Sequence, residues 1–349
     1  MPRKILITGN MGYIGPTLVK HLTASSHDDY EITGFDNGYF AHCLTSLDSF
    51  PERALKAQYF GDLRDFDGDI LNGIDTVIHL AAISNDPIGN VFADVTKSIN
   101  IDASVQVAQA AKKAGVRRFV FASSCSVYGA GSDKPCDENA PLNPLTPYAI
   151  SKIAMEDALE DLCDDTFSAV CLRFATACGM SDRLRLDLVL NDFVASVIST
   201  GKIEILSDGT PWRPLIHVKD MSRALEWGAL TDHAKPFLVL NSGSSIWNYQ
   251  IKDLAQAVAS AIPDSAVSLN QNAMPDKRSY QVDFSSFTEL AAGFTPVVTL
   301  EEAIEGLRSG LNRIGFNDPD FREHNLMRLR MLRSHQDHGV LNEDLRWIA

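Results

Sequence analysis

Tyr148 and Lys152, in the run TPYAISK, are two residues that together can do acid–base chemistry. They stand four positions apart in a segment, residues 148 to 163, whose apolar spacing predicts a helix, so both side chains should project from one face. A free phenol has a pKa of about 10, and a neighbouring ammonium favours the phenolate. We therefore expect Lys152 to lower the pKa of Tyr148. The same spacing is common on surface helices, so the pair needs support from other motifs.

Three glycines near the N-terminus predict a binding turn. Gly9, Gly12 and Gly15, in KILITGNMGYIG, follow a short apolar run and precede a segment with helical spacing. Glycine lets backbone N–H groups approach a pyrophosphate at a helix N-terminus. Pro16 fits the first turn of a helix, which we expect to begin near Met11 or Gly12. By themselves, three glycines are equally consistent with an ordinary strand–turn–helix.

Asp36 predicts which dinucleotide would bind. It ends the second apolar run, about 20 residues past the glycines, where a carboxylate can accept hydrogen bonds from both adenosine-ribose hydroxyls. The same charge would repel the additional phosphate of NADP, so the interpretation favours NAD. The alternative is that Asp36 only turns the chain, in the sequence Asp36-Asn37-Gly38.

The elements that must position these residues alternate along the first two thirds of the chain. The predicted strands are 5–8, 32–35, 76–82, 118–123 and 169–173, and the predicted helices are 13–25, 90–115 and 148–163. Nearly continuous apolar strands alternating with helices are typical of a parallel sheet covered on both faces. The predicted fold is α/β, a Rossmann-type doubly wound parallel sheet with a smaller C-terminal α/β substrate lobe.

We expect two domains. Residues 1–175 form the dinucleotide-binding Rossmann domain, joined by return segments near 217–245. Residues 176–349 form the substrate-binding lobe, in which the elements are shorter, and end in a helical tail.

Bulk properties exclude several kinds of partner and site. The 349 residues carry a net charge of −14, which argues against nucleic acid and acidic membrane surfaces. Six cysteines show no metal-type spacing and are interpreted as reduced core thiols, and the irregularly spaced His324, His335 and His338 predict no metal site. No apolar stretch approaches the roughly 20 residues needed to span a bilayer, and the N-terminus has no signal-peptide pattern, so we expect a cytoplasmic protein.

Taken in order along the chain, these motifs resemble the extended short-chain dehydrogenases/reductases, and among them the NAD-dependent nucleotide-sugar epimerases and dehydratases. The resemblance spans roughly residues 4 to 283. It implies that Asp62 and Leu63 contact adenine and that Asn100 steadies the active-site loop. The cofactor-binding positions it implies are Gly9, Met11, Gly12, Tyr13, Ile14, Gly15, Asp36, Asn37, Asp62, Leu63, Leu80, Ala81, Ala82, Asn100, Tyr148 and Lys152.

The resemblance also implies a catalytic triad of Ser124, Tyr148 and Lys152. Arg213 and Arg278 resemble the arginines that hold the substrate diphosphate, although each could instead form a surface ion pair. The implied substrate-binding positions are Ser84, Asn85, Ser124, Ser126, Tyr148, Thr176, Arg213 and Arg278. The stretch from Ser84 to Asp86 could equally be a simple turn.

Three departures from the family's patterns involve four positions. Cys125 and Ser126 stand where sugar 4,6-dehydratases carry an Asp-Glu pair, so water elimination has no obvious acid and base. Ser84 stands where galactose-type epimerases place a lysine, and Thr176 where such enzymes usually have asparagine. These departures weaken any assignment to one particular sugar.

The resemblance therefore implies a homodimeric epimerase that oxidises a hydroxyl of a nucleotide-diphosphate sugar, at C4, by transient hydride transfer to NAD. The main alternative is a nucleotide-keto-sugar reductase or sugar dehydrogenase. A 4,6-dehydratase and a non-catalytic NAD-binding protein are the further alternatives.

Overall fold

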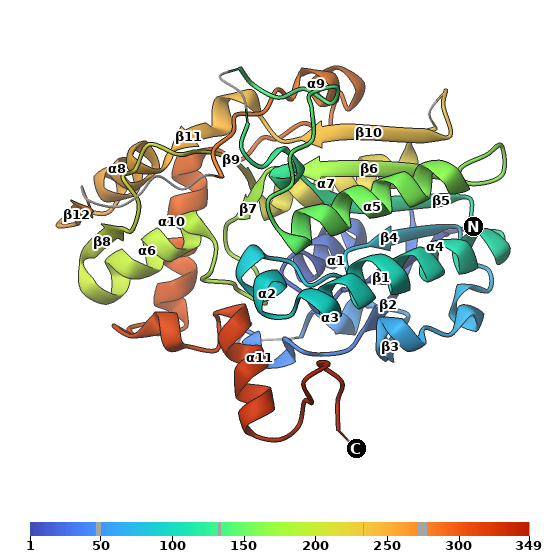
Figure 1. Ribbon diagram of the computed structural model, residues 1–349, viewed down its shortest axis with the longest axis horizontal. Helices are drawn as coiled ribbons and strands as arrows, with labels where there is room; N and C mark the ends of the chain where they lie inside the picture. Colours follow the sequence, from blue (N-terminus) through green and yellow to red (C-terminus); the bar gives the residue numbers. More distant parts are fainter. Residues whose placement is uncertain (47–49, 132–133, 233, 271–277, 349) are drawn as a thin grey trace.

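A seven-stranded parallel sheet forms the centre of the protein, shown in Figure 1 as a computed structural model. The structure describes residues 1–349 except 47–49, 132–133, 233, 271–277 and 349. The strand order is β10-β6-β5-β4-β1-β2-β3. The strands are β1 Arg3–Thr8, β2 Tyr30–Asp36, β3 Ala57–Phe60, β4 Thr76–His79, β5 Arg118–Ser124, β6 Ser168–Phe174 and β10 Phe237–Ser242. The predicted doubly wound, Rossmann-type sheet is confirmed.

Side chains alternate along each strand, so they project from both faces of the sheet. Helices bury both faces. Ile5 and Ile7 of β1 pack with α1 (Gly15–Thr23) and α7 (Val218–Leu230), whereas Leu6 between them packs on the opposite face. That opposite face is covered by α4 (Ser104–Lys113) and α5 (Pro147–Leu162). The α5 helix, which carries Tyr148 and Lys152, is thereby fixed against the sheet.

The first helix begins later than expected. The α1 helix starts at Gly15, so the prediction of a start near Met11 or Gly12 is wrong, although Pro16 does lie in its first turn. Residues 11–14 form a turn that lets the chain pass from β1 to α1. At the start of α1, Gly15 lies against the backbone of Asn10. A Cβ at Gly15 would lie 2.0 Å from the Asn10 carbonyl oxygen, so only glycine fits there.

The long helix predicted over residues 90–115 is broken. The segment folds as α2 (Asp86–Val91), α3 (Ala93–Lys97), a π-helical turn η5 (Ser98–Ala103) and α4. The break falls at Phe92, whose backbone angles of −120° and 54° are not helical. The fourth strand also stops at His79 rather than at residue 82, which leaves residues 80–82 as loop.

The second half of the chain builds a smaller group of elements beside the sheet (Figure 1). Its strands are β7 Thr176–Cys178, β9 Trp212–His217 and β11 Asn248–Gln250 in one sheet, and β8 Lys202–Ile205 with β12 Ala266–Leu269 in another. Its helices are α6 Val189–Thr200, α8 Ile251–Ala261, α9 Ser285–Leu290, α10 Leu300–Arg313 and α11 Arg328–Asp337. The domain boundary at residue 175 stays a prediction, but β10 and α7 return to the central sheet.

Short 3-10 turns connect these elements. They are η1 Ala41–Cys43, η2 Pro51–Ala54, η3 Leu63–Asp65, η4 Gly68–Leu71, η6 Cys125–Tyr128, η7 Ser245–Trp247 and η8 Phe321–Glu323. All six cysteines are free thiols, and five of them are buried. Among the helices of the described residues, none has the length and apolarity to cross a bilayer.

Candidate active site

A cavity of about 720 Å³ opens at the carboxyl ends of β1, β2, β4 and β5. This is where ligands bind in doubly wound sheets, and the volume is in the usual range for a ligand site. The predicted cofactor residues that line it are Gly9, Gly12, Tyr13, Ile14, Asp36, Asn37, Asp62, Leu63, Leu80, Ala81, Ala82, Tyr148 and Lys152. All eight predicted substrate residues line it too: Ser84, Asn85, Ser124, Ser126, Tyr148, Thr176, Arg213 and Arg278. Met11, Gly15 and Asn100 do not line it.

The glycine turn forms one wall of this cavity. Gly9 has a φ of +77°, and a Cβ there would lie 2.5 Å from the Ala81 backbone nitrogen. The loop after β4 therefore approaches the turn more closely than any side chain would allow. At Gly12 a Cβ would lie 3.1 Å from the Gly9 carbonyl oxygen. The turn thus presents bare backbone to the cavity, which suits a pyrophosphate.

Asp36 faces the cavity and also orders the turn. Its carboxylate accepts hydrogen bonds from the backbone N–H groups of Met11 at 2.9 Å and Gly38 at 2.8 Å. Burial raises its pKa, and these two hydrogen bonds oppose that shift. The two interpretations of Asp36 are therefore compatible: it shapes the Asp36–Gly38 turn and lines the cavity.

Asp62 forms an ion pair with the neighbouring Arg64. Its carboxylate accepts from the Arg64 backbone N–H at 2.9 Å and from the Arg64 side chain at 2.8 and 2.5 Å. Burial works against the charged carboxylate, but Arg64 outweighs it and the pKa of Asp62 is lowered. Arg64 also donates to the backbone oxygen of Asp344 at 2.8 Å, which joins this wall to the C-terminal tail.

Asn100 supports the active-site loop from behind. Its side-chain oxygen accepts from the Ile83 N–H at 2.8 Å, and its nitrogen donates to the Ile83 oxygen at 2.9 Å and to Ser151 Oγ at 3.1 Å. It is 3% exposed. Asn100 is therefore placed to fix the loop that carries Ser84 and Asn85, and any effect on a cofactor is indirect.

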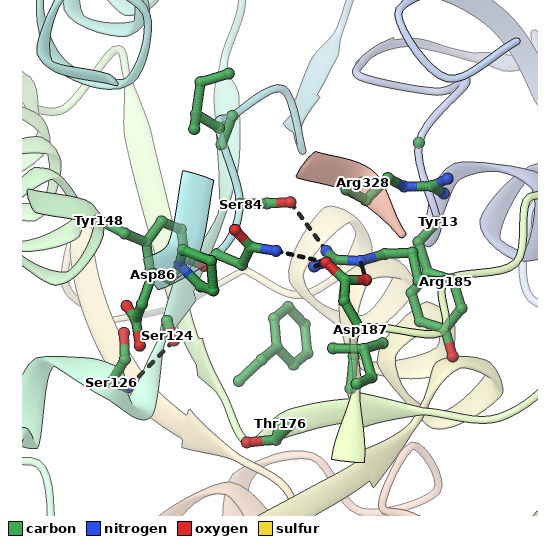
Figure 2. Close-up of a pocket in the computed structure, with 18 of the residues that line it drawn as sticks. Tyr13, Ser84, Asp86, Ser124, Ser126, Tyr148, Thr176, Arg185, Asp187 and Arg328 are labelled. Atoms are coloured by element: carbon green, nitrogen blue, oxygen red, sulfur yellow. Dashed lines mark hydrogen bonds and ion pairs between the residues drawn. The ribbon is translucent and has the colours of Figure 1, made fainter. Parts of the chain in front are cut away.

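Ser124, Tyr148 and Lys152 converge at one end of the cavity (Figure 2 labels the first two). The Ser124 side chain lies close enough to Tyr148 to lower the pKa of its phenol. The Lys152 ammonium lies 5.4 Å from the centre of the Tyr148 ring and donates to the Ala122 oxygen at 2.7 Å. One helix and the end of the adjacent strand thus supply a phenol, a hydroxyl and an amine to one place.

Burial controls the protonation of this group. It raises the pKa of Tyr148 to about 12, against the lowering effects of Ser124 and Arg185. It also lowers the pKa of Lys152 to about 7, against the effect of Glu156. The expectation that Lys152 lowers the pKa of Tyr148 is wrong for this structure, because a low-dielectric site favours the neutral form of both groups.

An ion pair that the motifs did not predict lies on the cavity wall, on the side away from Tyr148 (Figure 2). Arg185 contacts Asp187 twice, at 3.0 and 3.1 Å, and donates to Ser84 Oγ at 2.9 Å. Asn85 donates to the same carboxylate at 2.5 Å. The ion pair of Arg185 and Asp187 therefore holds Ser84 and Asn85, two of the predicted substrate residues. The only trace in the sequence is the alternation of charge and leucine in SDRLRLD, residues 181–187.

The two arginines expected at a diphosphate also lie on the cavity wall. Arg278 pairs with Asp86 at 2.7 Å, and Asp86 accepts from Thr146 Oγ1 at 2.7 Å. Arg213 donates to the Trp212 oxygen at 2.9 Å and lies 6.0 Å from the centre of the Tyr280 ring. An ion pair at Arg278 was one of the two alternatives, and it coexists with a position on the cavity.

Cys125 does not reach the cavity. Its thiol is buried and donates to the Arg173 oxygen at 3.0 Å. The next residue, Ser126, lines the cavity, and its backbone N–H donates to Ser124 Oγ at 3.1 Å. Neither of the two positions after Ser124 therefore offers a carboxylic acid or base.

Comparison with known proteins gives a consistent result. Residues 5–263 match the NAD dependent epimerase/dehydratase family. The UDP-glucose 4-epimerase of Bacillus subtilis strain 168 is 31% identical over 248 residues, which cover 62% of this chain and 70% of that enzyme. The human UDP-glucose 4-epimerase is 29% identical over 255 residues, 64% of this chain and 72% of that enzyme. The structure of MoeE5 in complex with UDP-glucuronic acid and NAD superposes with a TM-score of 0.74 at 27% identity, over 89% of this chain and 99% of MoeE5.

Proposed function

Because this chain belongs to the NAD dependent epimerase/dehydratase family, we propose that it epimerises a nucleoside-diphosphate sugar at C4 by transient hydride transfer to NAD. The resemblance to this family is confirmed, and NAD is the cofactor of the chain. Relatives at about 30% identity are UDP-glucose 4-epimerases, which supports both the reaction and a uridine diphosphate carrier.

The observation that carries the proposal is the grouping of Ser124, Tyr148 and Lys152 at the end of a cavity that begins at the glycine turn. The bare backbone at Gly9 and Gly12 fits the pyrophosphate of NAD, and Asp36 fits the adenosine ribose. A dinucleotide held in this way would extend toward Tyr148. A sugar in the remaining space would lie against Thr176, Ser84 and Asn85.

The residues divide the chemistry as follows. When bound, NAD supplies a hydride acceptor beside the sugar carbon. In its phenolate form, Tyr148 accepts the proton of the C4 hydroxyl, and Ser124 hydrogen-bonds the same oxygen and fixes its position. The positive charge that favours the phenolate comes from Arg185. The proton returns from Tyr148 when the hydride returns to the other face of the keto-sugar.

A dehydratase function has less support. Elimination of water needs an acid and a base beside the leaving hydroxyl, and the positions after Ser124 hold a buried thiol and a serine. A reductase or sugar dehydrogenase would use the same triad but must exchange its cofactor at each turnover. Cofactor exchange therefore separates these enzymes from an epimerase.

The test uses purified protein and a panel of nucleotide sugars and keto-sugars. We expect NAD to remain bound through purification, and NMR to detect conversion of one UDP-sugar into its C4 epimer with no net reduced nicotinamide. Accumulation of reduced nicotinamide, or a product that has lost water, would refute the proposal. We further propose that the protein forms a homodimer through α4 and α5, which light scattering tests. We also propose that it is cytoplasmic.

A further inference from the structure

The C-terminal segment from Phe321 onward lies beyond the residues that match the family, yet it forms part of the cavity wall. It packs between the loop after β2 and the segment around Arg185. Cys43 donates to the Asn325 oxygen at 3.2 Å, the Leu186 N–H donates to the Leu326 oxygen at 3.1 Å, and His335 Nε2 donates to the Tyr39 oxygen at 2.9 Å. The start of α11 is thereby fixed beside the cavity.

Arg328, the first residue of α11, carries a buried charge with an unused donor. It lines the cavity, is 1% exposed, and packs its guanidinium 4.5 Å from the centre of the Phe40 ring. Nη2 donates to the Arg183 oxygen at 2.9 Å, whereas Nη1 has no hydrogen-bond partner among the described residues. Leaving a buried charged donor unsatisfied is costly, so a residue of this kind indicates a missing anionic partner.

The carboxylate that acts electrostatically on Arg328 already has other partners. Asp187 acts electrostatically on Arg328 but accepts its hydrogen bonds from Arg185 and Asn85. Burial lowers the pKa of Arg328, as expected for a guanidinium without a bonded carboxylate.

The position of Arg328 indicates which anion it would meet. Arg328 and Arg185 both act electrostatically on the phenol of Tyr13, a residue that directly follows Gly12 in the glycine turn. Figure 2 shows both arginines on the same side of the cavity as Tyr13, away from Tyr148. A pyrophosphate held at the N-terminus of α1 would lie on that side. Phosphate oxygens are the partners to which a guanidinium fork is best matched.

We propose that Arg328 binds the pyrophosphate of NAD, so that α11 completes a cofactor site which the glycine turn begins. The proposal depends on the family's cofactor and not on the identity of the sugar. It also accounts for how a chain with a net charge of −14 holds a dianionic linkage, since Arg328 supplies a local cation.

The tail after α11 keeps the helix in place. The Tyr39 hydroxyl donates to the Leu345 oxygen, and Trp347 Nε1 donates to the Asn37 oxygen at 2.7 Å. Tyr39 and Asn37 both line the cavity on the side of Asp36. The segment that carries Arg328 is therefore anchored at both ends to the proposed adenosine half of the site.

The test compares Arg328→Met with Arg330→Met. Arg330 lies on the same helix, pairs with Glu323 and has a side chain that is 41% exposed, so its variant makes the same charge change outside the cavity. Calorimetry on cofactor-depleted protein measures the affinities for NAD, ADP, UDP and adenosine. We expect Arg328→Met to lower the affinities for NAD and ADP about tenfold or more, as for the loss of a charge-assisted hydrogen bond. The affinities for adenosine and UDP should stay unchanged. Arg330→Met should match the wild type throughout.

Each other outcome overturns the proposal in a distinct way. Unchanged NAD and ADP affinity would remove Arg328 from the cofactor site, and a loss confined to UDP would move it to the substrate. An equal loss for adenosine would indicate a structural role only. If Arg328→Met does not fold, Arg328→Lys provides the test, because it keeps the charge but not the planar guanidinium fork. The affinity for ADP should then fall while that for adenosine does not. An unchanged affinity for ADP would overturn the proposal. A wild type that does not bind NAD would instead contradict the proposed function.

Discussion

Burial opposes charge at both ends of the cavity, but it decides the protonation at only one of them. At the catalytic end burial prevails: the pKa of Tyr148 rises to about 12 and that of Lys152 falls to about 7. At the other end burial also opposes charge, but the ion pair outweighs it, so the pKa of Arg185 is raised and that of Asp187 is lowered. Because the pKa of Lys152 is close to neutral, the first end can exchange protons near neutral pH, whereas the other end keeps fixed charges. This difference is what a proton-transfer site beside a phosphate site requires.

The largest expected effect tests the proton-exchanging end. Tyr148→Phe removes the phenolic oxygen that, when ionised, accepts the substrate proton, but it keeps the ring. We therefore expect turnover to fall about a thousandfold or more while NAD affinity stays nearly unchanged. Tyr59→Phe is a matched control, because Tyr59 is 45% exposed and does not line the cavity. Steady-state rates and NAD titration measure both effects, and an active Tyr148→Phe protein would refute the mechanism.

The fixed-charge end is tested through stability. Asp187→Asn leaves Arg185 buried without its counter-charge, so we expect the free energy of unfolding to fall by about 3 kcal/mol. The control is Asp102→Asn, which breaks an exposed pair with Lys97 and should change it by less than about 1 kcal/mol. Urea denaturation measures both. Equal effects in the two variants would mean that the Arg185–Asp187 pair is no stronger than a surface contact.

A pH series sharpens the contrast at Lys152. Its pKa is about 7 in the folded protein and about 10.4 when unfolded, so the unfolded chain binds more protons between these values and Lys152 makes stability rise with pH. Lys152→Met lacks this titration. We expect its stability advantage over the wild type to be largest below pH 7 and to shrink by about 1.4 kcal/mol per pH unit from about pH 7 to pH 9. A constant difference would contradict the lowered pKa.

The smallest effect concerns cofactor choice. Asp36→Ala removes the charge that repels the additional phosphate of NADP, and we expect the preference for NAD to relax by about tenfold. Titration of the wild type and the variant with both cofactors measures this. A wild type that binds the two equally would show that Asp36 only shapes its turn.

The sequence predicted best the features that a single local segment encodes. Tyr148 and Lys152 share one helix, and the glycine turn and Asp36 follow directly from two strands. Arg185 and Arg328 come from segments that meet only in the folded chain, so no spacing reveals them. The apolar pattern alone does not predict the strand β3, because its residues Tyr59 and Phe60 are exposed. The wrong expectation for the pKa of Tyr148 has the same origin, since burial is a property of the fold.

Transfer of a label tests the central claim most directly. The substrate is the UDP-sugar that the panel identifies, deuterated at C4, and NMR follows the label in ordinary water. The account predicts that deuterium stays on C4 in both epimers, because the hydride passes to NAD and returns to the same carbon, and that no reduced nicotinamide accumulates. Loss of the label to solvent, or its appearance in a released nicotinamide, would contradict it.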